Sequence, residues 1–518
     1  MTIFDRLKYA LFKMLSIDNK MHNQELTTVN KSTIYDKYNI YDAWAIADAN
    51  ILENTYKQYI SANKNTFWAS VPEKNFSKRT TGLSKVILDS LVNIIAECYN
   101  NIIIDDEKNN ELWKNIEIDN NFFDLLISSI RDVLIFGDGA FKLTYDPEFS
   151  KYPILDFVPA KKCNIEYEHR QPKKITFFDK QYIDNNGNIY ILNEIYEKGK
   201  ITYELTNEQN QIVNMENIEE LRDLEPVYFS DPYFLAAIPF KFFDSSKYEN
   251  HGASIYESKL DILDALDEVF SSYCATIRYS IPKLVMSEDC FSRDEAGNVQ
   301  INDSIFSSIF SVMPEDLDNS NRINLYQSAL NSEEYGKTIS QLIALLCSNI
   351  ISLSTINIEL DNNIITSSDS GAAVREREKQ TLYTVNKIKN GLYYTLPKLV
   401  STTIRMYYML INQACEITEK NINIDFSEYA NPSFESKIET LKKAVGNYDI
   451  ISFEKIVDEL YGYTLTDKEK QEEIKKLYIL NKNVTSIDEL IKKDNINENT
   501  SENTDENTKE DISENIKE

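Results

Sequence analysis

The tetrapeptide Tyr335-Gly336-Lys337-Thr338 is the part of this 518-residue chain that comes nearest to a catalytic motif. It matches the end of the phosphate-binding pattern G-x-x-x-x-G-K-[ST], in which backbone N–H groups and the lysine hold the phosphates. The full pattern needs a glycine at position 331, where this chain has Asn331. It would also place Glu333 and Glu334 beside the phosphates, so spacing and electrostatics both argue against nucleotide binding.

Few other residues have the types and spacing that catalysis or metal binding requires. His22, His169 and His251 are the only histidines and are far apart in sequence, which argues against a histidine triad or a two-histidine metal site. The six cysteines form no C-x-x-C pair, which argues against a zinc site and favours a reducing, cytosolic compartment. We therefore predict that the protein is not an enzyme and uses no metal or cofactor.

Four acidic residues do follow a regular spacing, at intervals of four, three and four, so on a helix they line up as one stripe. They are Glu257, Asp261, Asp264 and Glu268. Apolar residues recur on another side of the same segment, at Ile255, Ile262, Leu263, Leu266, Val269, Phe270, Tyr273 and Ile277. The pattern predicts an amphipathic helix of about 26 residues, roughly 39 Å long, which ends before Pro282. Such a helix suits a strut, with its acidic stripe facing away from the core.

The composition limits the partners that the chain can have. Its net charge of -28 argues against ordinary nucleic-acid affinity, which depends on Lys and Arg neutralising phosphates. The hydrophobic fraction of 42% suffices for real cores, and the length suits two to four domains. We expect no membrane span and no signal peptide, because no run of 18 apolar residues occurs. The first 17 residues are amphipathic, which fits a helix docked on protein better than one lying on a membrane.

The hydrophobic period changes along the first half of the chain. We expect helices over residues 36–62, 83–100 and 121–136, and a strand over 140–146. The period then becomes two, which predicts an antiparallel meander with strands over 174–183, 188–196 and 200–205. The segments 184–187 and 197–199 contain the glycines that hairpin turns favour.

The second half again reads as mainly helical. After the acidic helix, a short strand is expected over 283–286, a helix-like run over 305–313, and a second long helix over 333–354. A polar loop precedes a third helix, expected from about residue 372 to 417 and bent at Gly391 and Pro397. Shorter helices are expected over 434–444, 452–461 and 466–480. The last 25 residues hold nine acids and two lysines, which predicts disorder.

The order of these parts resembles that of the portal proteins of tailed bacteriophages, of the type common in phages of Gram-positive bacteria. Four segments carry the resemblance: SKRTTGLSKVILDSLVNIIAE (77–97), FGDGAFKLTYD (136–146), YESKLDILDALDEVFSSYCATIRYSIPKLVMSEDCF (256–291) and SSDSGAAVREREKQTL (367–382). Together they are distributed between about residues 30 and 420. None is a short diagnostic motif, so the resemblance rests on their joint order.

The resemblance implies a helix-rich α+β fold with a portal-like architecture. It implies a wing over residues 1–250 with the meander at about 174–206, a first stem helix at 251–280, a clip at 281–332, a second stem helix at 333–355, a tunnel loop at 356–370, a kinked long helix returning to the wing at 371–420, a crown at 421–493 and an acidic tail at 494–518. Within the tunnel loop it points to Asp361, Asn362, Asn363, Ile364, Ile365, Thr366 and Ser367 as residues that approach DNA.

The resemblance also implies a function and partners. A portal is a homo-oligomeric ring, typically of twelve subunits, at one vertex of the capsid, so the chain is expected in the virion after assembly in the host cytoplasm. Double-stranded DNA passes through the ring without sequence-specific binding. The large terminase subunit docks during packaging, and head-completion or adaptor proteins dock afterwards. Major capsid and scaffold proteins surround the ring, and no membrane is involved.

Two other readings stay open at this point. The chain could be a virion protein that forms no conduit, such as an adaptor or baseplate component, or, with less support, a nucleotide hydrolase. The acidic stripe also has two interpretations of equal weight. It either lines the channel, where DNA would slide past carboxylates without being held, or it is the wet outer face of a helix.

Overall fold

The computed structural model describes residues 34–59, 66–71, 76–184, 187–222, 224–281, 283–287, 309–313, 323–327, 331–357, 378–427, 429, 454–455, 457 and 467–482. The chain divides into a large unit, Met1–Ile364 with Arg377–Tyr429, and a small unit, Ile365–Glu376 with Ala430–Glu518. In the small unit, α12 (Asp467–Lys482) confirms the helix expected over 466–480. The amphipathic N-terminus, the helix expected over 434–444 and the acidic tail lie outside the described residues.

The large unit begins with two helices where the sequence predicted one. Residues 34–46 are helical, and α2 follows as Ala49–Tyr59. The break lies at Ala47, whose φ of 56° is left-handed and cannot continue a right-handed helix. Asp48 then begins α2, because its carboxylate accepts hydrogen bonds from the backbone N–H groups of Asn50 and Ile51.

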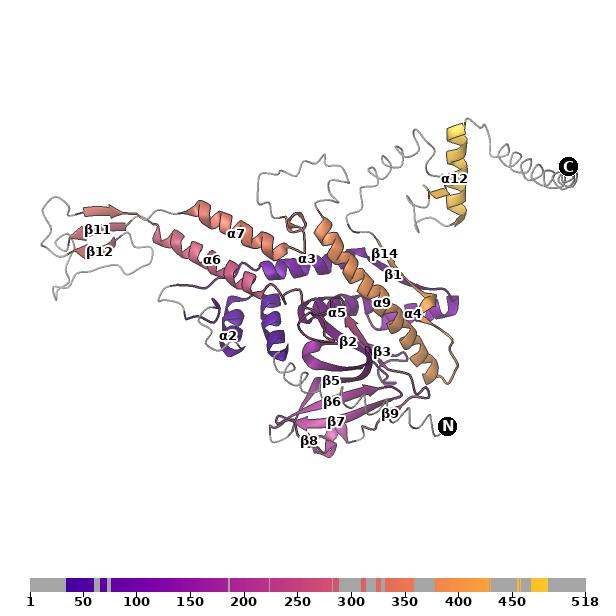
Figure 1. The fold of residues 1–518 in the computed structure, drawn as a ribbon. Coiled ribbons are helices and arrows are strands. Elements are labelled where there is room, and N and C mark those ends of the chain that lie inside the picture. Colours follow the sequence, from indigo (N-terminus) through magenta and orange to yellow (C-terminus); the bar gives the residue numbers. More distant parts are fainter. Residues whose placement is uncertain are drawn as a thin grey trace, which may run out of the picture. The chain divides into compact units, whose positions relative to one another are not determined.

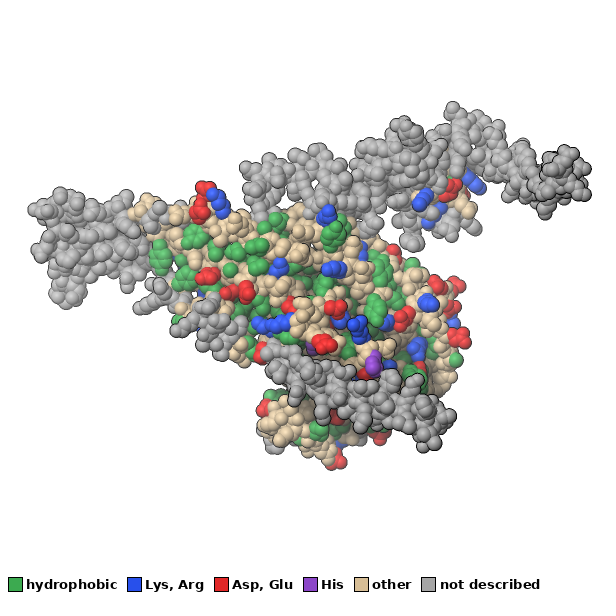
Figure 2. Space-filling model, viewed as in Figure 1, with side chains coloured by type: hydrophobic (Ala, Val, Ile, Leu, Met, Phe, Trp, Pro, Cys, Tyr) green, Lys and Arg blue, Asp and Glu red, His purple; other side chains and the backbone are tan. Residues whose placement is uncertain are grey.

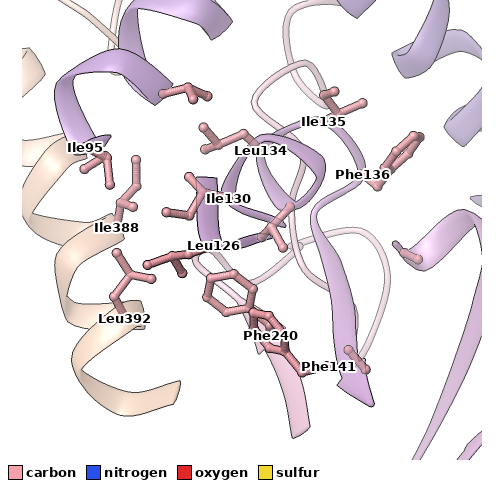
Figure 3. Packing of buried hydrophobic residues seen from close by; sticks show 14 of the residues in the cluster. Ile95, Leu126, Ile130, Leu134, Ile135, Phe136, Phe141, Phe240, Ile388 and Leu392 are labelled. Carbon is pink, nitrogen blue, oxygen red and sulfur yellow. The ribbon is translucent and has the colours of Figure 1, made fainter. Parts of the chain in front are cut away.

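Three further helices form the core of the large unit. They are α3 (Leu83–Cys98), α4 (Glu107–Asp119) and α5 (Phe122–Phe136), so the helices expected over 83–100 and 121–136 are confirmed. Between α3 and α4, β1 (Tyr99–Ile104) pairs antiparallel with the distant β14 (Ile422–Phe426). Figure 3 shows how Leu126 and Ile130 of α5 and Ile95 of α3 pack together with side chains of a later helix, α9 (Lys379–Leu410).

Two antiparallel sheets follow α5. The smaller has the order β10-β2-β3, with β2 (Asp138–Thr144), β3 (Ile154–Pro159) and β10 (Ala237–Lys241). The larger joins β4 (Cys163–Glu168), β5 (Gln171–Ile183), β6 (Ile189–Glu197), β7 (Lys200–Asn207) and β8 (Ile212–Val213), with β9 (Val227–Tyr228) also paired to β7. The strand over 140–146 and the meander are therefore confirmed. The turn glycines Gly187 and Gly199 have the positive φ that hairpin turns require.

A buried lysine ties the two sheets together. The Lys142 ammonium on β2 lies 3.2 Å from a Glu194 carboxylate oxygen and 3.1 Å from one of Asp179. Lys142 and Glu194 are both almost fully buried. Such a buried ion pair fixes the relative position of the two sheets more than it adds to the free energy of unfolding. Removing one partner is nevertheless costly, because the other charge is then buried and unpaired.

The acidic helix and its neighbours follow. They are α6 (Leu260–Tyr279), β11 (Lys283–Ser287), β12 (Ile309–Met313), β13 (Ile323–Tyr326) and α7 (Ser332–Cys347). The three strands form a sheet of order β12-β11-β13. The strand expected over 283–286 is confirmed, whereas the helix-like reading of 305–313 is wrong over Ile309–Met313, which is a strand.

Both long helices are shorter than predicted. Helix α6 has 20 residues, because the chain before Leu260 is a series of turns. Helix α7 ends at Cys347, where Ser348 is extended and Asn349 has a left-handed φ of 62°. The short 3-10 helix Leu353–Ile356 (η5) follows it. The apolar periodicity of the sequence extends beyond these helix ends, but the backbone conformations at the ends are not helical.

The third long helix, α9 (Lys379–Leu410), is continuous through Gly391 and Pro397 (Figure 1). A bend at these two residues stays a prediction, and residues 372–377 lie outside the described part of the chain.

The structure gives Gly391 a further role. A Cβ at this position would lie 2.8 Å from the Phe242 ring and 3.2 Å from the Lys241 carbonyl oxygen. The glycine therefore lets α9 approach the end of β10.

The backbones of Gly137 and Gly252 cross at the point where the segment that leads to α6 contacts the end of α5 and the start of β2. A Cβ on Gly252 would lie 2.0 Å from the carbonyl oxygen of Gly137, and a Cβ on Gly137 would lie 2.3 Å from that of Gly252. Asp138 fixes the crossing, because its carboxylate accepts a 2.9 Å hydrogen bond from the Gly252 N–H. No side chain fits at either glycine without moving the backbone.

We predict that Gly252→Ala lowers the free energy of unfolding by at least about 3 kcal/mol, because the added methyl meets backbone rather than a flexible side chain. A urea titration followed by tryptophan fluorescence measures this change. Gly336→Ala is the matched control, since a Cβ there meets nothing within 4 Å and Gly336 lies in a helix. It should be neutral or stabilise by up to about 1 kcal/mol. Equal stability of the two variants would contradict the crossing.

Candidate functional site

Helices α6 and α7 form an antiparallel hairpin that carries the β12-β11-β13 sheet at its far end (Figure 1). Near that end the rings of Tyr273 and Tyr335 lie with centroids 5.1 Å apart, and the Thr276 hydroxyl lies 3.1 Å from the Tyr335 hydroxyl. At the other end Lys259 contacts the last turn of α7. The end of α6 therefore lies beside the start of α7, and the start of α6 beside its end.

Lys259 joins the two helices at their base. Its ammonium donates hydrogen bonds to the carbonyl oxygens of Leu345 (2.8 Å) and Ser348 (3.0 Å) at the α7 C-terminus, where the last carbonyls of a helix lack N–H partners within it. A cation is favourable there because the helix dipole places partial negative charge at that end. The side chain is buried, and burial lowers the pKa of the ammonium.

The four residues of the predicted acidic stripe have different surroundings in the structure. Asp261 and Glu268 are exposed, as expected, and lie seven residues apart on one face of α6. Asp264 is 9% exposed, and its carboxylate accepts hydrogen bonds from the backbone N–H groups of Phe67 (2.8 Å) and Trp68 (3.2 Å). Glu257 precedes the helix, is half-buried and accepts a 2.7 Å hydrogen bond from the Ser245 hydroxyl. The prediction that the whole stripe avoids the core is therefore wrong for Asp264.

Asp267, which the spacing did not single out, belongs with Asp264. One of its oxygens accepts hydrogen bonds from the backbone N–H (2.8 Å) and the hydroxyl (2.9 Å) of Thr81. One turn further, the Ser271 hydroxyl accepts from the Arg79 N–H at 2.8 Å and donates to the Arg79 carbonyl at 3.1 Å. Asp264, Asp267 and Ser271 thus form a polar seam that binds the backbone of residues 67–68 and 79–81 to α6. The signal available in the sequence was the i, i+3, i+7 spacing of these three residues.

Burial changes the acidity of both seam carboxylates. For Asp264, burial raises the pKa, and the N–H groups of Phe67 and Trp68 oppose the rise. For Asp267, burial raises the pKa to about 6, and the hydrogen bonds from Thr81 only partly offset it. The second oxygen of Asp267 is buried without a hydrogen bond of ordinary geometry to any described residue. The charged form of Asp267 is therefore poorly stabilised.

A second hydrogen-bonded cluster joins the chain on either side of the predicted tunnel loop. The Ser352 N–H donates to the Thr381 hydroxyl at 2.8 Å, and the Thr355 hydroxyl bonds both Thr381 and the Glu378 carboxylate. Tyr429 donates to the same carboxylate at 3.1 Å. The loop residues themselves, Asp361 to Ser367, lie outside the described residues. Their position stays a prediction, but the segments that flank them are held together.

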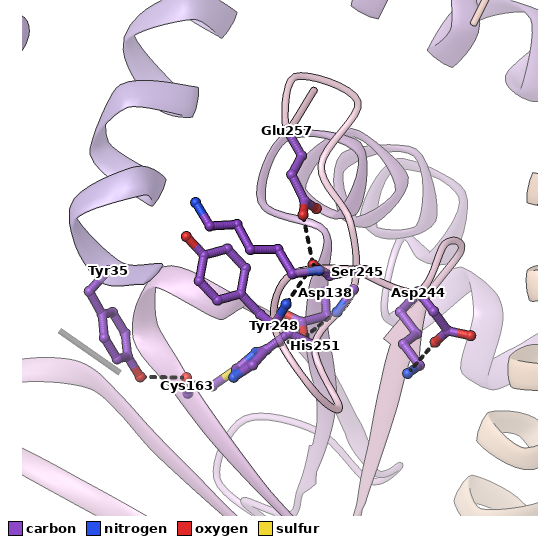
Figure 4. Close-up of polar contacts among 11 residues, drawn as sticks. Tyr35, Asp138, Cys163, Asp244, Ser245, Tyr248, His251 and Glu257 are labelled. Carbon is purple, nitrogen blue, oxygen red and sulfur yellow. Dashed lines mark hydrogen bonds and ion pairs between the residues drawn. The ribbon is translucent and has the colours of Figure 1, made fainter. Parts of the chain in front are cut away.

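Buried titratable groups gather around Asp138 (Figure 4). The His251 imidazole lies 3.3 Å from the Asp138 carboxylate, and the Tyr35 hydroxyl donates to the Cys163 carbonyl at 3.3 Å. Burial raises the pKa of the Cys163 thiol and of the phenols of Tyr35 and Tyr38, so these groups stay protonated near neutral pH. Protonated thiol and phenol groups are weak nucleophiles and bases. The cluster positions Gly252 rather than presenting reactive groups.

The Gly336-Lys337-Thr338 sequence lies inside α7, where its backbone N–H groups belong to the helix. The Lys337 ammonium lies 2.7 Å from a Glu333 carboxylate oxygen instead of being free for a phosphate. No group of metal-ligating side chains is present among the described residues, and no described helix is long and apolar enough to span a membrane. On the face drawn in Figure 2, acidic side chains are dispersed and form no continuous patch.

No protein-family model and no curated protein matches the chain. Among solved structures, it is similar to a chain of the "Neck of native GTA particle computed with C12 symmetry", with a TM-score of 0.38 and 10% identity over 73% of this chain and 90% of that one. It is also similar to a chain of the "Neck of empty GTA particle computed with C6 symmetry", with a TM-score of 0.39 and 11% identity over 74% and 91%. Both neighbours belong to the necks of symmetric particles.

We predict that Asp267 makes the large unit less stable as the pH rises from about 4 to 6. An unfolded aspartate titrates near 3.9, so below that pH both states are protonated, and above about 6 the folded state must bury the charge. Asp267→Asn removes this dependence. The unfolding free energy of the variant relative to wild type should rise by about 2 kcal/mol between pH 4 and 7.

Urea titrations at several pH values measure this difference. Asp261→Asn is the matched control for the loss of one carboxylate, because Asp261 is exposed on the same helix. A pH-independent difference for Asp267→Asn would show that the folded and unfolded states bind the proton equally.

Proposed function

We propose that this chain is the portal protein of a tailed bacteriophage, the subunit of a ring through which DNA enters and leaves the capsid. The observation that carries the proposal is the α6–α7 hairpin, which is fixed to an α+β body at one end and bears a small sheet at the other. An element of this kind, repeated around a ring axis, gives a rigid tube wall with a docking surface at its end.

The element order supports the same assignment. The body formed by α3, α5, the β10-β2-β3 sheet and the six-stranded sheet would be the wing, the α6–α7 hairpin the stem, and the β12-β11-β13 sheet the clip. Helix α9 would return the chain to the wing, and the segment between η5 and α9 would be the tunnel loop. In this arrangement the clip meets the terminase during packaging and head-completion proteins afterwards.

The charge of α6 supports a conduit that does not hold DNA. Asp261 and Glu268 are exposed on one face, and in the proposed ring they line the channel. Tight binding of duplex DNA depends on Lys and Arg that neutralise phosphates and release counterions. A wall that offers carboxylates lacks those contacts, so the DNA can slide.

We also propose that the chain hydrolyses no nucleotide and uses no cofactor, so the energy for packaging comes from a docked motor. The enclosure of the Gly-Lys-Thr sequence in α7 supports this part of the proposal. Purified protein should therefore show no ATPase activity above a buffer control. Measurable turnover that is lost in Lys337→Ala would contradict it.

The proposal predicts that the purified 60.1 kDa chain assembles into closed rings. Native mass measurement and class-averaged electron micrographs should show one oligomer, typically of twelve subunits, with a central hole that admits a DNA duplex, roughly 20 Å wide. A monomer, or a solid assembly without a hole, would favour an adaptor or baseplate component instead.

The channel assignment predicts that Asp261→Lys with Glu268→Lys leaves assembled rings intact but makes them bind duplex DNA. Lysines in the channel would contact phosphates, so affinity at 50 mM salt should rise at least about tenfold and fall again at 200 mM. Mobility-shift titrations at both salt concentrations measure this change.

Glu204→Lys with Glu208→Lys is the matched control, since it makes the same charge change at exposed positions around β7. Equal DNA binding by the two variants would place Asp261 and Glu268 on the outer surface of the ring.

A further inference from the structure

Arg79 and Arg278 lie on one flank of the α6–α7 hairpin, around a hollow of about 10 Å³. Ser77, Ser271 and Cys274 also line the hollow, and none of its lining residues is acidic. A volume of this size holds about one water-sized group. Within the described part of the chain, no carboxylate forms an ion pair with either guanidinium. Two unpaired arginines at one hollow are unusual on a chain of net charge -28.

The polar seam holds Arg79 in place. Both the N–H and the carbonyl of Arg79 bond the Ser271 hydroxyl. Arg278 lies seven residues after Ser271, two turns further on the same face of α6. The two side chains therefore project from one fixed surface, which we call the basic flank. Two arginines at one hollow suit a carboxylate, because each guanidinium can donate two parallel hydrogen bonds.

Helix α7 lies on the opposite side of α6. It contacts α6 through Tyr273 and Thr276. Successive residues of a helix are turned by about 100° around its axis, so these two side chains leave α6 roughly 140–160° away from the direction of Arg278. The first turn of α7 holds Glu333 and Glu334, whose side chains are 80% and 76% exposed. Among the described residues they share Lys337 as their one ion-pair partner, so this turn keeps a net negative charge. We call it the acidic flank.

The two flanks lie at the same level of the hairpin. Tyr335, in the first turn of α7, contacts Thr276, which is two residues before Arg278. A ring built by head-to-tail contacts needs two different and complementary surfaces on each subunit, one on either side. The hairpin offers opposite charges on opposite sides at one level, which meets that requirement.

We propose that Arg79 and Arg278 of one subunit bind Glu333 and Glu334 of a second copy of this chain. The inference rests on the proposed ring and names contacts that close it. Subunits of net charge -28 repel one another, and cations placed against carboxylates at the contact between them offset that repulsion. A carboxylate is favoured over the alternative ligand, a DNA phosphate, because the chain itself presents the exposed carboxylates of Glu333 and Glu334 at the same level of the hairpin.

Two charge reversals and their mixture test the proposal. Arg79→Glu with Arg278→Glu gives a subunit whose two flanks are both acidic, and Glu333→Arg with Glu334→Arg gives one whose two flanks are both basic. Each variant alone should require at least about tenfold more protein for half-assembly than wild type, since like charges then meet at every contact. Mixed in equal amounts, the two variants should form rings again, because alternating subunits restore opposite charges at every contact.

Analytical ultracentrifugation and micrographs of each sample measure assembly, and circular dichroism with thermal unfolding checks that each variant is folded. Arg170→Glu with Arg222→Glu is the matched control, because it makes the same charge change at exposed positions on and beside the six-stranded sheet. It should assemble like wild type.

The outcomes separate this inference from the proposed function. Wild-type protein that never forms rings would overturn both. Wild-type rings together with unimpaired rings of Arg79→Glu, Arg278→Glu would overturn the inference alone, and a loss only of DNA binding in that variant would assign the arginines to phosphate. Folded variants that fail to assemble separately and also fail as a mixture would overturn the proposed pairing.

Discussion

The crossing of the chain at Gly137 and Gly252 is the constraint on which the rest of the large unit depends. Here the end of α5 and the start of β2 meet the segment that leads into α6, with no space for a side chain on either glycine. Asp138 fixes the contact through the Gly252 N–H, and the N–H of Ile255 bonds the Leu134 carbonyl just beyond it. Because the crossing lies at the base of the hairpin, it determines the direction in which α6 leaves the body.

Carboxylates serve opposite purposes on neighbouring turns of α6. Asp264 and Asp267 are buried and act as acceptors for backbone N–H groups, a role that an acidic helix can fill at the cost of raised pKa values. Asp261 and Glu268 stay in water, where their charge costs little. Acidic side chains therefore bind the backbone of Phe67, Trp68 and Thr81 to one face of the helix and keep another face negative. Net charge alone does not distinguish these two roles.

Local patterns in the sequence predicted the elements more accurately than their ends or contacts. The helix at 83–100 and the meander follow from apolar period and turn glycines, and both are present. The early end of α7 depends on a left-handed Asn349, which apolar spacing does not reveal. The burial of Asp264 depends on a segment nearly two hundred residues away, so spacing within the helix could not predict it. Similarly, the sequence predicts that Gly391 bends its helix, and only the position of β10 shows that the glycine allows the two elements to come close.

The three faces of the hairpin would allow the proposed portal subunit, although acidic, both to assemble and to let DNA pass. At about 100° per residue, the exposed face of Asp261 and Glu268 lies between the basic flank at Arg278 and the side covered by α7. If neighbouring subunits meet through the two flanks, the face between them is turned either to the ring axis or directly away from it. Contacts between subunits and contacts with DNA then use separate residues. A charge change on one face should therefore leave the other function intact, which a single mixed surface would not permit.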